Sequence, residues 1–163
     1  MEEKTNDIAY YKTPIGIAKI IGDTDGIISV SVMDDENVEI SKVVPDSLQE
    51  CIKQLDEYFQ KERTDFDLKL NPQGTEFQRK VWKELQNIPY AKTITYLEQS
   101  KKMESVKAIR AIASANGKNP IWIIIPCHRV IGSDGSLTGY ASGIWRKKWL
   151  LEHENPSNQT ILF

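Results

Sequence analysis

The sequence contains few of the side chains that build disulfides and metal sites. Among its 163 residues are two cysteines, Cys51 and Cys127, and two histidines, His128 and His153. A disulfide framework is therefore not expected, and a zinc site built from Cys and His has too few candidate ligands. We expect a protein without metal or cofactor, and its two isolated thiols suit the reducing cytoplasm.

Long hydrophobic runs are lacking as well. The apolar run at residues 121–125 is far shorter than the roughly 20 residues that cross a bilayer. No segment near Met1 joins a basic head to a long apolar stretch, as a signal peptide does. We expect no membrane partner, and a chain of this length can bury a core in one generous domain or two small ones.

What is present is a charge asymmetry beneath the net charge of −2. Residues 1–75 carry 8 Lys and Arg against 16 Asp and Glu, a net charge of −8, whereas residues 76–163 carry 13 against 7, a net charge of +6. The composition changes near residues 71–74, which are typical of a turn, so we expect domains at 1–74 and 75–163. The basic half indicates DNA or RNA as a partner, with ordinary scatter of surface charge as the alternative.

The N-terminal half is typical of a small sheet with one helix. Three short runs rich in β-forming residues are expected to be strands, at residues 7–11, 16–22 and 27–33. Asp25 and Gly26 between two of these runs predict a hairpin. Apolar residues then recur at helical spacing over residues 45–62, and Cys51 lies on their stripe, which indicates a core residue.

The C-terminal half is typical of a mostly helical domain, so the fold class is α+β. Thr75 and Gln78 predict a capping box, followed by a helix that ends at Pro89. Helices at residues 96–102 and from Ser105, whose side chain can cap the second one, to just before Gly117 predict a helix-turn-helix. The second helix carries basic, polar or small residues on its outer faces: Lys107, Arg110, Ser114, Ala108 and Ala111. The alternative is a surface helix with solvated charges.

Residues 126–130 place a thiol, Cys127, beside the imidazole of His128 and the guanidinium of Arg129. Cysteine reacts as the thiolate, which needs a nearby base or cation to form. Adjacent residues in an extended stretch point to opposite sides, so we expect His128 to act on Cys127 through a water and a third group to orient His128. The alternative is that Cys127 is a small buried hydrophobe.

The chain resembles the O6-alkylguanine-DNA alkyltransferases in the type, order and spacing of several motifs. These are Tyr96, Arg110, the pair Asn119 and Pro120, residues 126–130, the pair Gly139 and Tyr140, and residues 149–154. The resemblance is close over residues 75–154 and looser over the N-terminal sheet, which it implies is ribonuclease H-like. It implies DNA repair by irreversible, single-turnover transfer of a methyl group from O6-methylguanine to Cys127, with O4-methylthymine as a further candidate substrate.

The resemblance also implies roles for the residues around Cys127. Glu154 would orient His128, which would deprotonate Cys127 through a water. Tyr96 would donate a proton to the purine ring, the alternative being a core tyrosine. Asn119 would hold the turn and the cysteine network, the alternative being a simple turn residue.

Double-stranded DNA is the partner that the resemblance implies, bound through the minor groove with the damaged base flipped out. Arg110 would fill the vacated place in the base stack. The other implied DNA-binding residues are Thr95, Lys107, Ala108, Ala111 and Ser114. The implied base pocket consists of Val130, Tyr140, Ala141 and Trp145. Some relatives have serine where Ala141 stands, and Trp145 is bulky, so the range of alkyl groups stays open.

Two other kinds of function are kept as alternatives. One is an alkyltransferase-like protein that binds lesions without repairing them, and the other is a Cys/His hydrolase. The presence of Cys127 argues against the first, because non-repairing relatives replace that cysteine. No oxyanion-hole pattern supports the second. Nothing in the sequence indicates an oligomer, so we expect a monomer.

Overall fold

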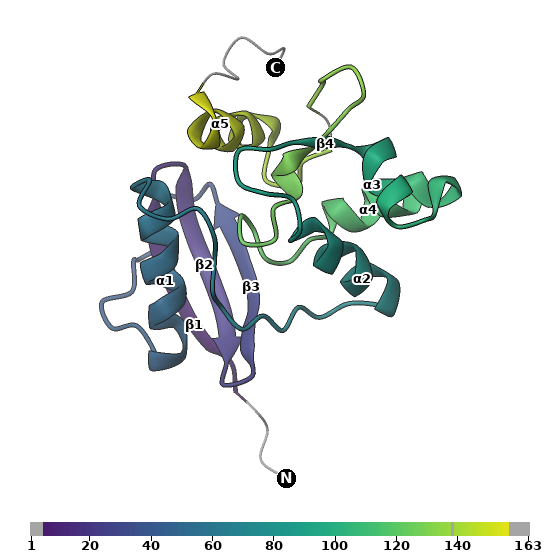
Figure 1. Cartoon of the computed structure of the whole chain (residues 1–163). Helices are drawn as coiled ribbons and strands as arrows, with labels where there is room; N and C mark the ends of the chain where they lie inside the picture. Colours follow the sequence, from purple (N-terminus) through teal and green to yellow (C-terminus); the bar gives the residue numbers. More distant parts are fainter. Residues whose placement is uncertain (1–4, 138, 157–163) are drawn as a thin grey trace. The chain divides into compact units, whose positions relative to one another are not determined.

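The computed structural model describes residues 5–137 and 139–156 (Figure 1). The chain divides into two compact units. The first runs to Gln73 and also includes Pro120–Trp122, while the second holds Gly74–Asn119 and the described residues from Ile123 onward. The division into domains 1–74 and 75–163 stays a prediction. It does not account for Pro120–Trp122, which belong to the first unit.

The first unit is built on a three-stranded antiparallel sheet. Its strands β1 (Asp7–Thr13), β2 (Gly16–Asp23) and β3 (Gly26–Met33) are neighbours in chain order. The three predicted strands are confirmed, each slightly longer than expected. Residues Ala18 and Ile20 on β2 are fully buried, as the alternation of a strand with one face on a core requires.

The predicted hairpin joins β2 and β3, with Thr24 and Asp25 between the two strands. Gly26 opens β3 at a φ of 133°, and a Cβ added there would lie 2.7 Å from the carbonyl oxygen of Lys69. Only glycine fits this position without strain, because it lacks the Cβ.

Helix α1 (Asp46–Phe59) packs on this sheet (Figure 1). Its face toward the sheet buries Leu48, Cys51, Leu55 and Tyr58 completely. Each large side chain of this kind contributes about 1.5–3 kcal/mol by leaving water. The amphipathic helix and the core position of Cys51 are thus as predicted.

Two later segments pair with β3. The backbone of Ile27 exchanges hydrogen bonds with Lys69 and Asn71, and that of Val30 does so with Pro120 and Trp122. The segment around residue 71 is therefore more than a linker. It satisfies backbone groups of a strand that would otherwise lie at an edge of the sheet.

The second unit is mainly helical. Its helices are α2 (Glu76–Leu85), α3 (Tyr96–Lys102), α4 (Ile109–Gly117) and α5 (Ile144–Glu154). Thr75 caps α2 in the predicted capping box, since its side chain accepts from the Gln78 amide and the Gln78 side chain accepts from the Thr75 amide. No helix in the described residues combines the length and apolar character that crossing a membrane takes.

Helices α3 and α4 are joined by a buried pair of amide side chains. Gln99 donates to Asn116 at 2.9 Å and Asn116 donates back to Gln99 at 2.7 Å. Behind them the indole Nε1 of Trp82 on α2 donates to the carbonyl oxygen of Ala115 at 2.8 Å. Buried polar groups that are satisfied in this way fix one arrangement of the helices.

The start of the second helix of this pair differs from the prediction. A 3-10 turn, η1 (Val106–Ala108), precedes α4, and the Ser105 side chain makes no capping hydrogen bond. The Ser105 carbonyl oxygen instead accepts from the Ala108 amide. The tight 3-10 turn uses the backbone of Ser105, so the side chain is not needed as a cap.

Candidate active site

Cys127 opens the short 3-10 turn η2 (Cys127–Arg129), which follows a buried apolar run. That run belongs to both units, because Ile121 and Trp122 lie in the first unit and the chain returns to the second at Ile123. Ile123 has a φ of 69°. A β-branched residue in this region is strained by about 1–3 kcal/mol, so the surrounding structure must hold the turn in place.

Asn119 lies directly against the thiol. Its Nδ2 donates to the carbonyl oxygen of Ile125 at 2.7 Å and to Sγ of Cys127 at 3.3 Å. One side chain thus fixes both the turn before the cysteine and the sulfur atom itself. This contact fits the role that the resemblance implies for Asn119.

His128 and Arg129 meet a single carboxylate, that of Glu154 at the end of α5. Nε2 of His128 lies 2.7 Å from Oε2 of Glu154. Arg129 donates from Nε to Oε1 at 2.8 Å and from Nη2 to Oε2 at 3.0 Å, and its Nη1 donates to the carbonyl oxygen of Ile88 at 2.7 Å. All three side chains are buried. Arg129 therefore braces Glu154 in a bidentate pair.

The electrostatics of this cluster define the protonation of His128. Burial raises the pKa of Glu154, but His128 and Arg129 outweigh it and hold that pKa well below its usual range. Glu154 is then an acceptor only, so Nε2 of His128 must carry the proton. Burial lowers the pKa of His128, so its ring is neutral near neutral pH. Nδ1 has no hydrogen-bond partner among the described residues and keeps a lone pair for a proton.

The thiol itself is not ionised by burial. Burial raises the pKa of Cys127, whereas the Asn119 hydrogen bond and the charge of Lys147 lower it. A protonated thiol beside a neutral imidazole is an arrangement in which the imidazole can act as a base. The arrangement therefore allows a thiolate to form at Cys127 by transfer of the thiol proton to His128.

Thr95 and Tyr96 stand at the start of α3. Thr95 belongs to the short strand β4 (Ile94–Thr95), which pairs in parallel with β5 (Val130–Ile131). Its hydroxyl caps α3 by accepting from the Glu98 amide. This pairing joins the start of α3 to the strand that follows η2.

The predicted pocket residues come from two places in the second unit. Val130 is fully buried on β5, Tyr140 is partly buried, Ala141 is exposed and Trp145 on α5 is 55% exposed. The guanidinium of Arg146 lies 4.4 Å from the centre of the Trp145 ring.

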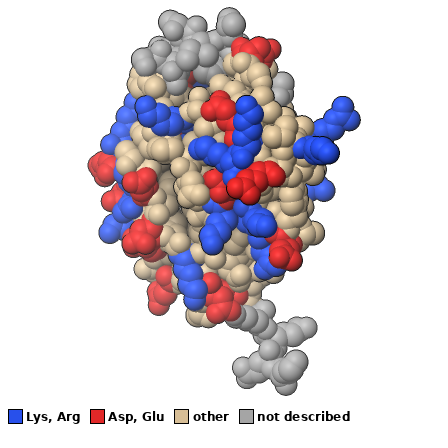
Figure 2. All heavy atoms as spheres, turned by 45° about the vertical axis from the view of Figure 1, so that its right-hand side comes forward, with Lys and Arg blue, Asp and Glu red and all other residues tan. Residues whose placement is uncertain are grey.

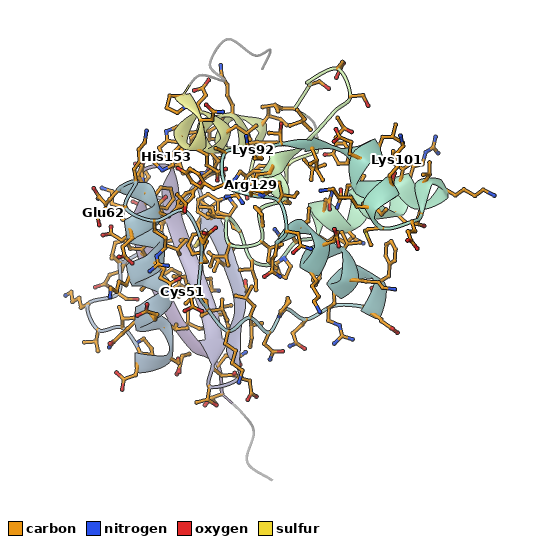
Figure 3. All side chains as sticks on the ribbon, viewed as in Figure 1. Cys51, Glu62, Lys92, Lys101, Arg129 and His153 are labelled. Atoms are coloured by element: carbon orange, nitrogen blue, oxygen red, sulfur yellow. The ribbon has the colours of Figure 1, made fainter. Side chains whose placement is uncertain are left out.

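The predicted DNA-binding residues lie on η1 and α4, except Thr95, which is half-buried on β4. Lys107, Arg110, Ala111 and Ser114 are exposed and Ala108 is half-buried. Residues 96–118 hold five cations and two acidic residues, a net charge of +3. Figure 2 shows Lys and Arg interspersed with Asp and Glu on the visible face, and Figure 3 shows Lys101 extending outward from α3.

Lys147 is a residue of this site that the sequence reasoning missed. It lies on α5 and is only 1% exposed. Its Nζ lies 5.8 Å from the ring centre of Tyr96 and 5.9 Å from that of Tyr140. The signal in the sequence was its spacing of seven residues before Glu154, which puts both on one face of a helix. Among the described residues, no group of three or more His, Cys, Asp and Glu could hold a metal ion.

Comparison with known proteins identifies the family of the chain. Residues 76–156 match the family model described as 6-O-methylguanine DNA methyltransferase, DNA binding domain, and residues 8–72 match the ribonuclease-like domain of the same proteins. Fold and site together define an α+β protein in which a cysteine stands next to a buried pair of histidine and carboxylate. The chain belongs to the 6-O-methylguanine DNA methyltransferase family.

Individual relatives cover most of the chain. The methylated-DNA–protein-cysteine methyltransferase of Methanosarcina acetivorans is 46% identical over 154 residues, which are 90% of this chain and 96% of the relative. The crystal structure of the Mycobacterium tuberculosis O6-methylguanine methyltransferase matches with a TM-score of 0.81 and 40% identity, over 93% of this chain and 94% of that one. A structure of the M. tuberculosis protein OGT in complex with DNA matches with a TM-score of 0.80 and 40% identity, over 90% and 91%.

Proposed function

We propose that this protein repairs DNA by moving the methyl group of O6-methylguanine onto Sγ of Cys127, in one irreversible reaction per molecule. The observation that carries the proposal is the chain of contacts from Asn119 to the thiol, and from His128 to Glu154. It supplies a nucleophile, a base and a group that orients the base. Membership of the family supports the same reaction.

The proton and the electron pairs balance as follows. Nδ1 of His128 takes the thiol proton through a bridging water, and the imidazolium is stabilised by Glu154. The sulfur lone pair then forms the S–C bond to the methyl carbon as the C–O bond breaks, and the electrons of that bond pass to the purine. A proton from the hydroxyl of Tyr96 neutralises the leaving guanine, and the imidazolium of His128 then returns its proton to the Tyr96 phenolate, so that both side chains end neutral. Cys127 ends as a thioether, which is neither nucleophile nor leaving group.

Binding of duplex DNA is assigned to the exposed surface of η1 and α4. The cations Lys107 and Arg110 would meet phosphates or bases, while Ala108 and Ala111 allow close approach to a narrow groove. Arg110 would occupy the place of the flipped base. We propose minor-groove entry, because contacts there depend little on sequence and a lesion can occur anywhere. The DNA complex of the M. tuberculosis relative supports DNA as the partner.

Further parts of the proposal concern the setting. The protein would act as a monomer in the cytoplasm, where two cysteines that form no disulfide stay reduced. O4-methylthymine is a second proposed substrate. The base pocket would consist of Val130, Tyr140, Ala141 and Trp145, with a DNA contact from the backbone or side chain of Thr95. Ser114 would contribute a further polar contact.

Mass spectrometry tests the reaction. Incubation with duplex DNA carrying O6-methylguanine should add one methyl group to the intact protein, located on the peptide that contains Cys127. Undamaged duplex is the control. If the protein binds the lesion but gains no mass, it is a lesion-binding protein and the proposed repair function is refuted.

Replacing Arg110 tests base flipping apart from chemistry. Arg110→Ala should slow repair in duplex DNA far more than reaction with free O6-benzylguanine, because only the duplex must unstack a base, at a cost of a few kcal/mol. Lys118→Ala, an exposed cation just beyond α4, is the matched control for lost charge. Equal losses on the duplex and the free base would remove Arg110 from the flipping step.

A further inference from the structure

Arg129 makes contacts on two sides of the candidate site. The residue, labelled in Figure 3, is 6% exposed, and its guanidinium pairs with the carboxylate of Glu154 through Nε and Nη2. The remaining nitrogen, Nη1, donates at 2.7 Å to the carbonyl oxygen of Ile88, just beyond the end of α2. One planar group therefore joins the carboxylate that contacts His128 to a different segment of the chain.

That segment is the turn at residues 88–92, which lies between α2 and β4. The backbone N–H of Lys92 donates to the carbonyl oxygen of Pro89 at 3.1 Å, which closes a β-turn. Ala91 has a φ of 64° in this turn, a left-handed conformation that strains a residue with a Cβ. Such strain persists only where the surrounding contacts hold the chain in place.

Two more contacts tie this turn to the cluster around Glu154. The backbone N–H of Ala91 donates to Oε1 of Glu154 at 3.4 Å, and the guanidinium of Arg129 lies 5.7 Å from the ring centre of Tyr90. A cation is attracted to the face of an aromatic ring at this distance. Together with the bond to Ile88, the pair of Arg129 and Glu154 holds the turn at three points.

The far end of the same stretch is fixed to the residues that follow Arg129. Strand β4 pairs in parallel with β5, so that Thr95 lies opposite Ile131. Tyr96 is the next residue after β4 and opens α3. The stretch that leads from α2 to Tyr96 is therefore attached at one end to η2 and at the other to the strand directly after it.

We propose that Arg129 is a positioning residue for the acid as well as for the base, and that it sets where Tyr96 stands relative to the thiol. The inference rests on the proposed function, in which Tyr96 protonates the leaving purine. Arg129 exchanges no proton in this scheme. Through Glu154 it orients His128, and through the turn at residues 88–92 it holds the stretch that ends at Tyr96. An acid must lie within hydrogen-bond reach of the atom it protonates, so displacing Tyr96 costs rate.

Two reactions of the same thiol separate the acid from the base. Free O6-benzylguanine needs no base flipping, but its guanine needs a proton as it leaves. Iodoacetamide needs the thiolate alone, because iodide leaves as a stable anion. The ratio of benzyl transfer to alkylation, both measured on the peptide that contains Cys127, therefore reports on Tyr96 and cancels any change in the amount of thiolate.

Arg129→Lys is the variant that should change this ratio. Lysine keeps a cation beside Glu154 but lacks the planar fork that reaches Ile88 at the same time. The ratio should fall about tenfold, because Tyr96 loses its fixed place. An unchanged ratio in the folded variant overturns the proposal, since Arg129 would then serve only the base or the fold.

Arg63→Lys is the matched control. Arg63 donates from Nε to Glu57 at 3.3 Å and from Nη1 to the carbonyl oxygen of Asp65 at 2.9 Å. It thus makes the same two kinds of bond in the first unit. Its replacement should leave the ratio at the parental value, and a fall as large as that of Arg129→Lys would overturn the proposal.

A double-mutant cycle tests whether Arg129 acts through Tyr96. The acid is missing in Tyr96→Phe, so adding Arg129→Lys should leave the ratio where Tyr96→Phe alone puts it. A ratio that falls equally with and without Tyr96 overturns the proposal, because Arg129 would then act by another route.

Tyr90 supplies a second test in case Arg129→Lys does not fold. Tyr90→Leu removes the ring beside the guanidinium, whereas Tyr90→Phe keeps it. The ratio should fall about threefold in Tyr90→Leu and stay at the parental value in Tyr90→Phe. Equal ratios in these two variants would then overturn the proposal.

Fluorine NMR keeps this inference apart from the repair function. In protein labelled with fluorotyrosine, Tyr96→Phe identifies the signal of Tyr96. That signal should move in Arg129→Lys, while the signals of Tyr11 and Tyr58 in the first unit stay fixed. A Tyr96 signal that does not move overturns the proposal. A parent that accepts no methyl group from damaged DNA, together with a Tyr96 signal that moves, would refute the repair function alone.

Discussion

Cys51 and Cys127 carry the same thiol in two different regions of the molecule. Cys51 lies on α1 facing the sheet of the first unit (Figure 3), and burial alone raises its pKa to about 12. Burial also raises the pKa of Cys127, but Asn119 and Lys147 oppose that rise. The two thiols therefore differ in their neighbours, which oppose the effect of burial on the pKa at Cys127 but not at Cys51.

The two regions also differ in how they use polar groups. Around Cys51 the helix α1 offers apolar neighbours such as Leu48 and Leu55. Around Cys127 the buried residues include His128, Arg129, Lys147 and Glu154, each costly to bury and each held by a partner or a ring. A protein accepts such a cost where the charges serve a reaction.

The largest expected effect comes from exchanging sulfur for oxygen at both positions. Cys127→Ser should abolish methyl transfer, because a serine hydroxyl is a far weaker nucleophile. Cys51→Ser should transfer at the parental rate. Methyl incorporation from labelled O6-methylguanine DNA measures both rates. A Cys127→Ser protein that still accepts methyl groups would contradict the proposal that Cys127 is the acceptor.

Glu154→Gln is expected to slow transfer by about 10²- to 10⁴-fold. The amide can donate to Nε2 of His128 and so favour the wrong tautomer. It also leaves the buried charge of Arg129 uncompensated, which should cost about 3–5 kcal/mol of unfolding free energy. Rates from single-turnover assays and urea unfolding measure the two effects.

Glu152→Gln is the matched control for that variant. Glu152 lies on the same helix, but its pair with Lys148 at 4.0 Å is partly exposed, so little should change. A Glu154→Gln protein that transfers at the parental rate would exclude Glu154 from the reaction.

A smaller effect is expected from pH on the rate of methyl transfer at Cys127, because the rate depends on the protonation of His128, which has no counterpart proposed beside Cys51. Burial lowers the pKa of His128 below its ordinary value of 6.5, so the neutral base persists into mildly acidic solution. Transfer should hold at pH 6.5 and decline only as the pH falls through the lowered pKa, because a protonated ring accepts no further proton. Rates between about pH 5 and 9 test this. A transfer rate that has already fallen to half when the pH is lowered to 6.5 would contradict this expectation.

The smallest expected effect is on the stability of the first unit. Cys51→Ser places a hydroxyl in an apolar core, which should cost about 1–3 kcal/mol of unfolding free energy. Thermal or urea unfolding measures this cost, and the transfer rate serves as the control. A destabilised protein with an unchanged rate would show that Cys51 acts only as a packing residue.

The elements of this fold were largely predictable, because local signals specify them. The three strands follow from β-rich runs with turns between them, and α2 from Thr75 and Gln78. The pairing of β3 with Lys69, Asn71 and residues 120–122 was not predictable, since each contact joins segments distant in the chain.

The candidate site was predictable only in part. The resemblance named Cys127, His128, Glu154 and Asn119, and the structure brings these four together, although their roles stay proposals. Lys147 was missed, because a lysine on a helix is ordinarily solvated and nothing local marks it as buried. The left-handed backbone of Ile123 was missed for a similar reason, since an isoleucine gives no sign of strain.

The paired amides of Gln99 and Asn116 have a consequence for ionic strength. Two neutral hydrogen bonds hold α3 to α4, and such bonds are not screened by salt. The proposed attraction of Lys107 and Arg110 for DNA phosphates would be screened beyond about 8 Å at physiological salt. Rising salt should therefore lower the affinity for DNA, while the angle between α3 and α4 stays the same. Salt concentration would then change the affinity without changing the shape of the surface that binds DNA.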